Sequence, residues 1–329
     1  MRNEGDMNKE SKNLYANQSA WRELQEFLPE RLRLKNDEDL PLEEFWDWKG
    51  NQIHLDRYLN PNAPAKVILH HGVGTNGRQL MLIIGKVLAD RGWEVTALDN
   101  LGYGMTQVAK GYTPGYDDWV QLATDYVAHE KSRDDRPIVL YGLSAGGMLT
   151  YHVASRAPKG SIAGIVGMTF LDQRISEVAN TTAHDPLTAR FGPKIMGALS
   201  KTPLRGFRYP MTLASKMTTL VNNKEAMKVL LRDKTSANNA MWIKFLAEYM
   251  TFNPDVEYAD FDRCPILLTQ PSEDRWTPRR LSVPVLSKIT KVSVETVMLE
   301  NAGHYPLEDP GLLQMKNVID SFVRKVCGQ

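Results

Sequence analysis

The chain has 329 residues, with 40 basic and 39 acidic side chains and a formal net charge of +1. This length is ample for a large core in one or two domains, and the balanced charge gives no electrostatic case for binding nucleic acid or an anionic membrane. The two cysteines lack metal or redox spacing and exclude a disulfide framework, and no apolar run reaches membrane-spanning length.

Residues 1–40 are expected to form an N-terminal extension with one short helix. Residues 1 to about 18 are polar and lack the apolar core of a signal peptide, so we expect disorder there and a cytoplasmic protein. From Ser19, large apolar residues at helical spacing predict an amphipathic helix. The segment Leu40 to Tyr58 then predicts two strands joined by a tight turn at Lys49-Gly50-Asn51.

A buried strand, Lys66 to His70, leads into the loop His71-Gly-Val-Gly-Thr-Asn-Gly77. The spacing Gly72-x-Gly74-x-x-Gly77, with Asp99 at the end of the next strand, also fits a dinucleotide-binding loop. That alternative leaves the serine, acid and histidine farther along the chain without a role. We interpret His71 as a residue that braces the loop by hydrogen bonds.

A second buried strand, Pro137 to Tyr141, runs directly into Gly142-Leu-Ser-Ala-Gly146 and then into a helix. Ser144 therefore lies on a sharp strand-to-helix turn, where a side chain two residues away on either side would collide. This G-x-S-x-G pattern is that of a nucleophile elbow, which exposes the serine hydroxyl above a sheet. Glycine and serine are common residues, so the pattern needs catalytic partners before it carries a function.

Strands and helices alternate around these two motifs, which predicts an α/β fold with a mostly parallel sheet. The further elements expected are a helix over 77–90, a strand over 93–98, a helix over 116–131 and a strand over 162–168. Between Leu171 and about Tyr258 the alternation stops, and four helices are expected instead, over 186–200, 210–221, 223–232 and 236–250.

Two loops near the C-terminus carry the partners that a nucleophilic serine needs. The strand Pro265 to Gln270 is followed by Asp274, and the strand Val292 to Leu299 is followed by His304. A serine hydroxyl is a weak nucleophile, so a histidine must take its proton and a carboxylate must orient that histidine. We assign these roles to His304 and Asp274, with Glu273 and Asp172 as alternatives for the acid.

The order of Ser144, Asp274 and His304, the Asp-x-Trp-Thr-Pro loop and the tail around His304 resemble α/β-hydrolase-fold serine hydrolases. Within that fold the chain is similar to the capped esterases and monoacylglycerol-lipase-like enzymes, from about Glu44 to the C-terminus. The resemblance implies hydrolase-core segments at 41–170 and 259–329. It also implies a helical cap over 171–258, inserted after the sixth strand.

The resemblance further implies where the substrate binds. The backbone N–H groups of Val73 and Ala145 would form the oxyanion hole. The residues expected to line the substrate pocket are Tyr103, Met168, Trp242 and Trp276.

The expected function is hydrolysis of a carboxylic ester, lactone or thioester of a small or acyl-chain substrate, through an acyl-enzyme. The reaction requires no metal and no organic cofactor, and a homodimer is left open. Hydrolysis of a carbon–carbon bond and acyl transfer use the same three residues and remain alternatives. A protein of this fold that binds a small ligand without turnover is a further alternative.

Overall fold

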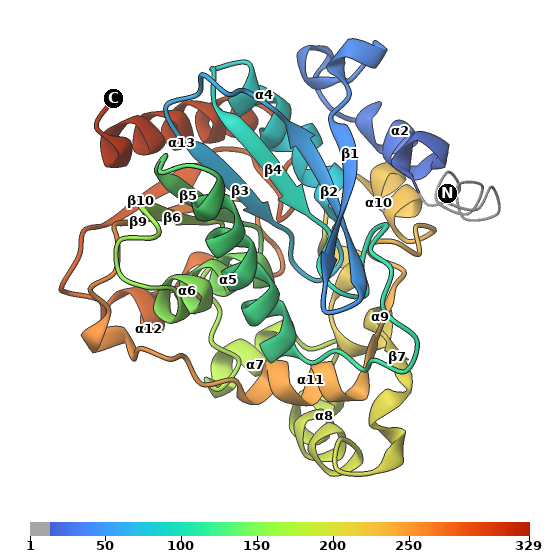
Figure 1. Ribbon diagram of the computed structural model, residues 1–329. Coiled ribbons are helices and arrows are strands. Elements are labelled where there is room, and N and C mark those ends of the chain that lie inside the picture. The colour runs from blue at the N-terminus through green and yellow to red at the C-terminus, as the bar shows by residue number, and fades with distance from the viewer. Residues whose placement is uncertain (1–13) are drawn as a thin grey trace.

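A computed structural model describes residues 14–329 of the chain. Its centre is an eight-stranded sheet in the order β1-β2-β4-β3-β5-β6-β9-β10 (Figure 1). β1 pairs antiparallel with β2 and β2 antiparallel with β4, whereas all other neighbours are parallel. The strands are β1 (Leu42–Trp48), β2 (Asn51–Tyr58), β3 (Lys66–His70), β4 (Glu94–Leu98), β5 (Ile138–Gly142), β6 (Gly164–Gly167), β9 (Ile266–Pro271) and β10 (Val294–Leu299).

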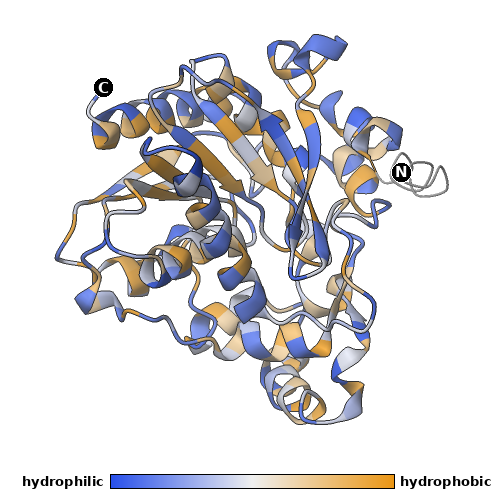
Figure 2. Ribbon diagram, viewed as in Figure 1, coloured by the Kyte–Doolittle hydropathy of each residue, from blue (hydrophilic) through white to orange (hydrophobic). Residues whose placement is uncertain are grey.

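Helices cover both faces of this sheet, as the alternation of the sequence predicts. α4 contacts α13, α5 contacts α6, and the two pairs lie on opposite faces (Figure 1). Every residue of β3, β4 and β5 is buried, and Figure 2 shows β3 and β4 as more hydrophobic than β1 and β2. These helices are α3 (Gly77–Leu80), α4 (Lys86–Ala89), α5 (Tyr116–Arg133), α6 (Ala145–Arg156), α12 (Val283–Leu286) and α13 (Gly311–Cys327).

The expectation of disorder over residues 1–18 is wrong where the structure can test it, and residues 1–13 lie outside the described part. Tyr15 lies in a short helical turn and is fully buried, because its ring packs against His54 and its hydroxyl binds Asp99. The expected amphipathic helix follows as α2 (Ala20–Gln25), which buries Trp21.

The insertion between β6 and β9 is mostly helical, but it also holds a small sheet that the sequence did not predict. Its elements are α7 (Ser176–Thr182), α8 (Pro186–Leu199), β7 (Arg208–Pro210), α9 (Met211–Ala214), α10 (Lys224–Leu230), β8 (Ala240–Trp242) and α11 (Ile243–Thr251). The helix expected over 236–250 starts only at Ile243, because Asp233 accepts the hydroxyl of Ser236 in a turn and β8 pairs with β7. Short polar side chains favour such turns over helix.

The parallel strands place four loops at one edge of the sheet, next to the insertion. These loops follow β3, β5, β9 and β10, and they carry the glycine-rich segment, Ser144, Asp274 and His304. Among residues 14–329, no helix is both long enough and apolar enough to cross a membrane.

Candidate active site

Ser144 occupies a backbone conformation that non-glycine residues rarely adopt, with φ 83° and ψ −117°. Such a conformation costs about 1–3 kcal/mol and persists only where the surroundings enforce it. β5, α6 and the end of β3 enforce it here. A Cβ on Gly142 would overlap backbone atoms of Gly146 and Gly147 across the turn, and a Cβ on Gly146 would overlap the backbone oxygen of His70. The turn thus fixes the serine Oγ above the sheet edge, as the glycine spacing predicts.

His304 lies in the loop after β10 and reaches the serine directly. Its Nε2 is 2.8 Å from Oγ of Ser144, and the side chain is almost completely buried. The ring packs against Trp276 at a centroid distance of 4.8 Å, and the N–H of Tyr305 donates to the carbonyl of Leu220. The histidine is therefore held within proton-transfer distance of the hydroxyl.

Asp274 lies in the turn after β9 and binds the other nitrogen of the histidine. Its Oδ2 is 2.8 Å from Nδ1 of His304, and its Oδ1 accepts the backbone N–H groups of Trp276 and Thr277. Burial favours a higher pKa, but the charge of His304 and the hydrogen bonds from His304 and Thr277 outweigh it and lower the pKa of Asp274 to about 2. The carboxylate is therefore ionised at neutral pH.

The two alternative acids do not approach the histidine. The carboxylate of Asp172 binds Arg174 and the hydroxyl of Tyr258, at 2.9 and 2.7 Å. The side chain of Glu273 points to solvent. Within the described residues, Asp274 is the carboxylate that contacts His304.

Thr277 is a member of the site that the sequence reasoning missed. Its hydroxyl donates to Oδ2 of Asp274 at 2.7 Å and lies 3.0 Å from Nδ1 of His304. A threonine three residues after an aspartate, in a turn, was the available signal, because such side chains commonly bind one another or the intervening backbone.

The loop after β3 lies directly against the elbow. A Cβ added to Gly72 would be 2.8 Å from Cβ of Ser144 and 2.9 Å from the backbone nitrogen of Ala145. Within residues 14–329, the N–H groups of Val73 and Ala145 have no hydrogen-bond acceptor. Two unpaired donors therefore flank the serine on adjacent loops, which is the arrangement that an oxyanion requires.

His71 braces this loop, as the sequence reasoning expected. Its Nε2 accepts the backbone N–H of Asn100 at 2.9 Å, so its Nδ1 carries the proton and donates to the carbonyl of Gly72 at 2.8 Å. Burial lowers the pKa of His71, which keeps the ring neutral in this role.

The dinucleotide alternative does not fit the surroundings of Asp99. This carboxylate is fully buried and accepts the N–H groups of Gly77 and Met105 and the hydroxyl of Tyr15. It therefore has no exposed oxygen for a ribose.

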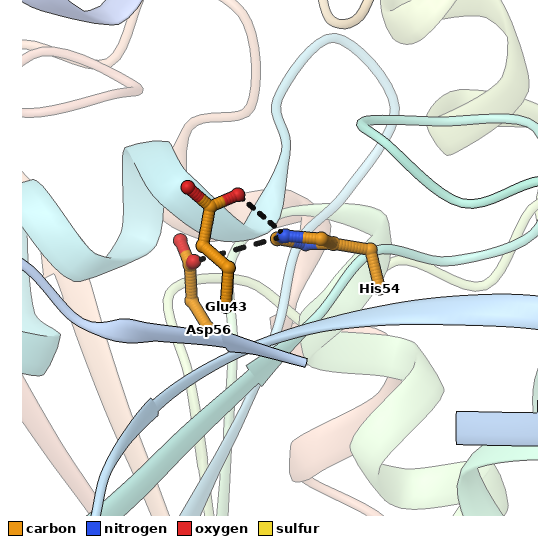
Figure 3. A group of neighbouring side chains, drawn as sticks. All are labelled: Glu43, His54 and Asp56. Atoms are coloured by element: carbon orange, nitrogen blue, oxygen red, sulfur yellow. Dashed lines mark hydrogen bonds and ion pairs between the residues drawn. The ribbon is translucent and has the colours of Figure 1, made fainter. Parts of the chain in front are cut away.

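A group of buried ionisable side chains lies on β1 and β2, beyond Asp99. Figure 3 shows the carboxylates of Glu43 and Asp56 at one edge of the His54 ring. Three such ligand types together could suggest a metal site. The guanidinium of Arg78 already occupies this position, because it donates to both oxygens of Asp56 at 2.6 and 2.9 Å and lies 3.4 Å from Glu43. We therefore interpret the group as a buried ion-pair network.

An apolar cavity of about 470 Å³ leads from Ser144 into the insertion. Its wall holds no Asp, Glu, Lys, Arg or His side chain among the residues that the structure describes. The core contributes few residues to it, and α7, α8, α9 and α11 contribute most of the others. Those that shape its apolar surface include Leu171, Phe191, Met196, Met211, Leu246, Tyr249 and Trp276.

Only one of the four residues expected to line the pocket does so, namely Trp276. Tyr103 and Trp242 line a separate, more polar cavity of about 420 Å³. Tyr103 packs under the loop against Trp119, and Trp242 stacks on Arg208 beside Gly102. Met168 is buried, and its backbone N–H donates to the carbonyl of Gly142 beneath the cavity. The sequence could not predict these orientations, because contacts with residues distant along the chain determine them.

Comparisons with known proteins identify the family and the fold of this chain. The family described as serine aminopeptidase, S33, matches residues 61–311. An uncharacterized abhydrolase domain-containing protein from Dictyostelium discoideum is 23% identical over 241 residues. That match covers 73% of this chain but only 24% of the relative, so it extends over about a quarter of that protein.

Two solved structures show the same fold. A soluble variant of monoglyceride lipase from Saccharomyces cerevisiae, in complex with a substrate analog, is similar with a TM-score of 0.70 and 18% identity. The match covers 91% of this chain and 98% of that one. Monoacylglycerol lipase from Paleococcus ferrophilus is similar with a TM-score of 0.65 and 18% identity, over 83% of this chain and 99% of that one.

Proposed function

The chain belongs to the serine aminopeptidase S33 family of α/β-hydrolase-fold enzymes, and we propose that it hydrolyses a carboxylic ester, lactone or thioester with an apolar acyl group. One observation carries the proposal. Ser144 lies within 2.8 Å of His304 at the inner end of a cavity whose wall is free of charged side chains.

The first half of the proposed reaction forms an acyl-enzyme. Oγ of Ser144 attacks the carbonyl carbon while its proton passes to Nε2 of His304, and Asp274 stabilises the resulting imidazolium. The carbonyl oxygen becomes an oxyanion, which the N–H groups of Val73 and Ala145 stabilise. As the carbon–oxygen or carbon–sulfur bond breaks, His304 returns the proton to the departing alcohol or thiol.

The second half releases the acid. Water attacks the acyl-enzyme carbonyl and gives its proton to Nε2 of His304, which then protonates Oγ of Ser144 as the carboxylic acid departs. The same two N–H donors stabilise the second oxyanion.

The proposed substrate class follows from the wall of the cavity. Its volume lies in the usual range for small-ligand sites, and an unbranched acyl chain or a compact apolar group would bury its surface there. We propose that the insertion over 171–258 acts as the cap of the site. The two monoacylglycerol lipases with this fold act on substrates of that class by name, which supports the proposal.

The composition of the wall favours this class over the others considered. An aminopeptidase must bind the ammonium group of its substrate, and no carboxylate lines the cavity within residues 14–329. Carbon–carbon hydrolysis of an acidic substrate would need a cation, and no Arg or Lys lines it. A ligand-binding protein without turnover would have no need for a serine held in a strained turn against a histidine.

Hydrolysis of p-nitrophenyl esters from acetyl to palmitoyl tests the proposal, with wild type compared with Ser144→Ala. We expect turnover and fluorophosphonate labelling in the wild type and neither in the variant. Aminoacyl p-nitroanilides serve as the peptidase comparison. A wild type that cleaves anilides faster than esters, or that neither turns over esters nor labels, would contradict the proposal.

A further inference from the structure

Large apolar side chains are exposed together on one part of the insertion. Eleven large hydrophobic residues are exposed in the described part of the chain, and six of them fall within residues 187–213. Phe207 is 63% exposed and Leu187 is 69% exposed, and all residues from Lys201 to Arg208 are exposed. The six are Leu187, Phe191, Ile195, Leu204, Phe207 and Leu213. Apolar side chains grouped in this way indicate an interaction surface.

The same segment has a strong positive charge. Residues 186–216 contain six basic residues and no Asp or Glu, although the whole chain has a net charge of only +1. The six are Arg190, Lys194, Lys201, Arg205, Arg208 and Lys216. Within the residues that the structure describes, none of them forms an ion pair, although Arg208 donates hydrogen bonds to Asn239 and to the carbonyls of Ala240 and Gly102. The balanced net charge of the chain therefore hides a local excess of positive charge, and this surface, unlike the chain as a whole, can attract an anionic membrane.

The cavity that leads to Ser144 opens on this surface. Leu187, Phe191 and Ile195 of α8 line the cavity and are also about half exposed or more. α8 lies at the end of the molecule remote from α13, at the bottom of the view in Figure 1. We call residues 186–216 the tip surface. An apolar molecule bound to the tip surface would be at the mouth of the cavity.

We infer that the tip surface docks on an anionic lipid surface and presents the mouth of the cavity to it. Exposed aliphatic and aromatic side chains enter the boundary between headgroups and acyl chains, while Lys and Arg remain with the anionic headgroups. The unpaired cations favour this partner over a second copy of the chain, because a symmetric contact would oppose like charges. The docking is independent of catalysis, but delivery of an acyl substrate from the lipid rests on the proposed function.

Co-sedimentation of the full chain with lipid vesicles tests the inference. The Ser144→Ala protein is used first, with vesicles of phosphatidylcholine alone and of phosphatidylcholine mixed with phosphatidylglycerol. Each basic residue near an anionic surface raises the partition coefficient of a protein onto the vesicles about fivefold. We therefore expect binding to the mixed vesicles that weakens with salt, and a loss of roughly tenfold or more in Lys194→Glu/Lys201→Glu. Leu204→Ser/Phe207→Ser removes the apolar part and should also reduce binding.

The control variant is Leu313→Ser/Lys316→Glu, which makes the same kinds of change on α13 at the other end of the molecule. It should bind as the wild type does. Equal binding by the tip-surface variants and this control would overturn the inference, as would the absence of binding to mixed vesicles. Self-association that the tip-surface variants abolish, without vesicle binding, would instead assign the surface to a second copy.

Hydrolysis of a soluble short-chain ester separates this result from the proposed function. Leu204 and Phe207 do not line the cavity, so their double variant should retain the wild-type rate on that ester. If docking holds and the ester is not cleaved by wild type, the proposed function fails and the docking surface stands.

Discussion

The hydroxyl of Tyr15 lies 2.9 Å from both carboxylate oxygens of Asp99, a residue that follows it by 84 positions. Asp99 also accepts the N–H of Gly77, the first residue of α3 after the glycine-rich loop. The N-terminal segment is thus connected through one buried carboxylate to the loop that approaches Ser144. The contact stabilises the fold and the loop together.

Tyr15→Phe should lower the free energy of unfolding by about 1.5–3 kcal/mol, because a buried carboxylate loses a hydrogen-bond donor. Urea unfolding followed by circular dichroism measures the change. Tyr112→Phe is the matched control, since its hydroxyl also donates to a carboxylate, Asp118, but in a partly exposed position. Its loss should be less than about 1 kcal/mol. Equal effects of the two variants would show that burial of the Tyr15 contact is unimportant.

Asp274→Asn should lower kcat for p-nitrophenyl esters by about 10⁴, because an amide cannot hold Nδ1 of His304 protonated. Asp172→Asn is the control that tests the alternative acid. Its carboxylate binds Arg174 and Tyr258, so the change should lower stability and leave kcat of the folded enzyme nearly unchanged. A larger loss of kcat in Asp172→Asn than in Asp274→Asn would reverse the assignment.

Gly72→Ala should lower kcat by about 10²–10³, the usual effect of losing one oxyanion donor. The added Cβ would lie 2.8 Å from Cβ of Ser144, so the loop that carries Val73 must shift away from the elbow. Gly197→Ala in α8 is the control, because no atom lies within 4 Å of the Cβ it adds. Burst kinetics with p-nitrophenyl acetate report the effect on acylation. An unchanged burst rate in Gly72→Ala would contradict the role proposed for this loop.

The pH dependence of stability should reveal the charge of His54. Burial favours a lower pKa, but the contacts with Asp99 and Glu43 outweigh it and raise the pKa of His54 from 6.5 to about 10. The folded state therefore binds this proton more tightly than the unfolded state. The stability that protonated His54 contributes is fully present below about pH 6.5, and it is lost as the pH rises to about 10.

The midpoint of urea unfolding, followed by circular dichroism, should fall between pH 7 and 10 in the wild type. His54→Gln should be less stable at pH 7 and should show a smaller decline over the same range. Parallel declines in the two proteins would mean that His54 is not charged in the folded state.

The arrangement of the three proposed catalytic residues could be predicted from the sequence where local rules determine it. The glycines around Ser144 require a sharp turn, and Asp274 and His304 follow buried strands whose carboxyl ends share one edge of a parallel sheet. Chain order and strand ends were therefore enough to predict that these three side chains come together.

The wall of the cavity could not be predicted in this way. Met168 and Trp242 are apolar residues near the right loops, but Met168 is buried in the core and Trp242 lines a separate cavity. Tyr15 was missed because most of residues 1–18 are polar, and its partner Asp99 is distant along the chain. Thr277 was missed because its role depends on the conformation of the turn at Asp274. Long-range packing decides each of these cases.

The proposed catalytic residues and the residues that form the cavity wall come from different parts of the chain. Ser144, Asp274 and His304 all lie on loops of the sheet, whereas the insertion supplies nearly all of the apolar wall. Substitutions in α8 or α11 can therefore change which acyl group fits without displacing a reacting atom. Such a division allows substrate preference to diverge among descendants of one ancestor while the chemical step is inherited intact.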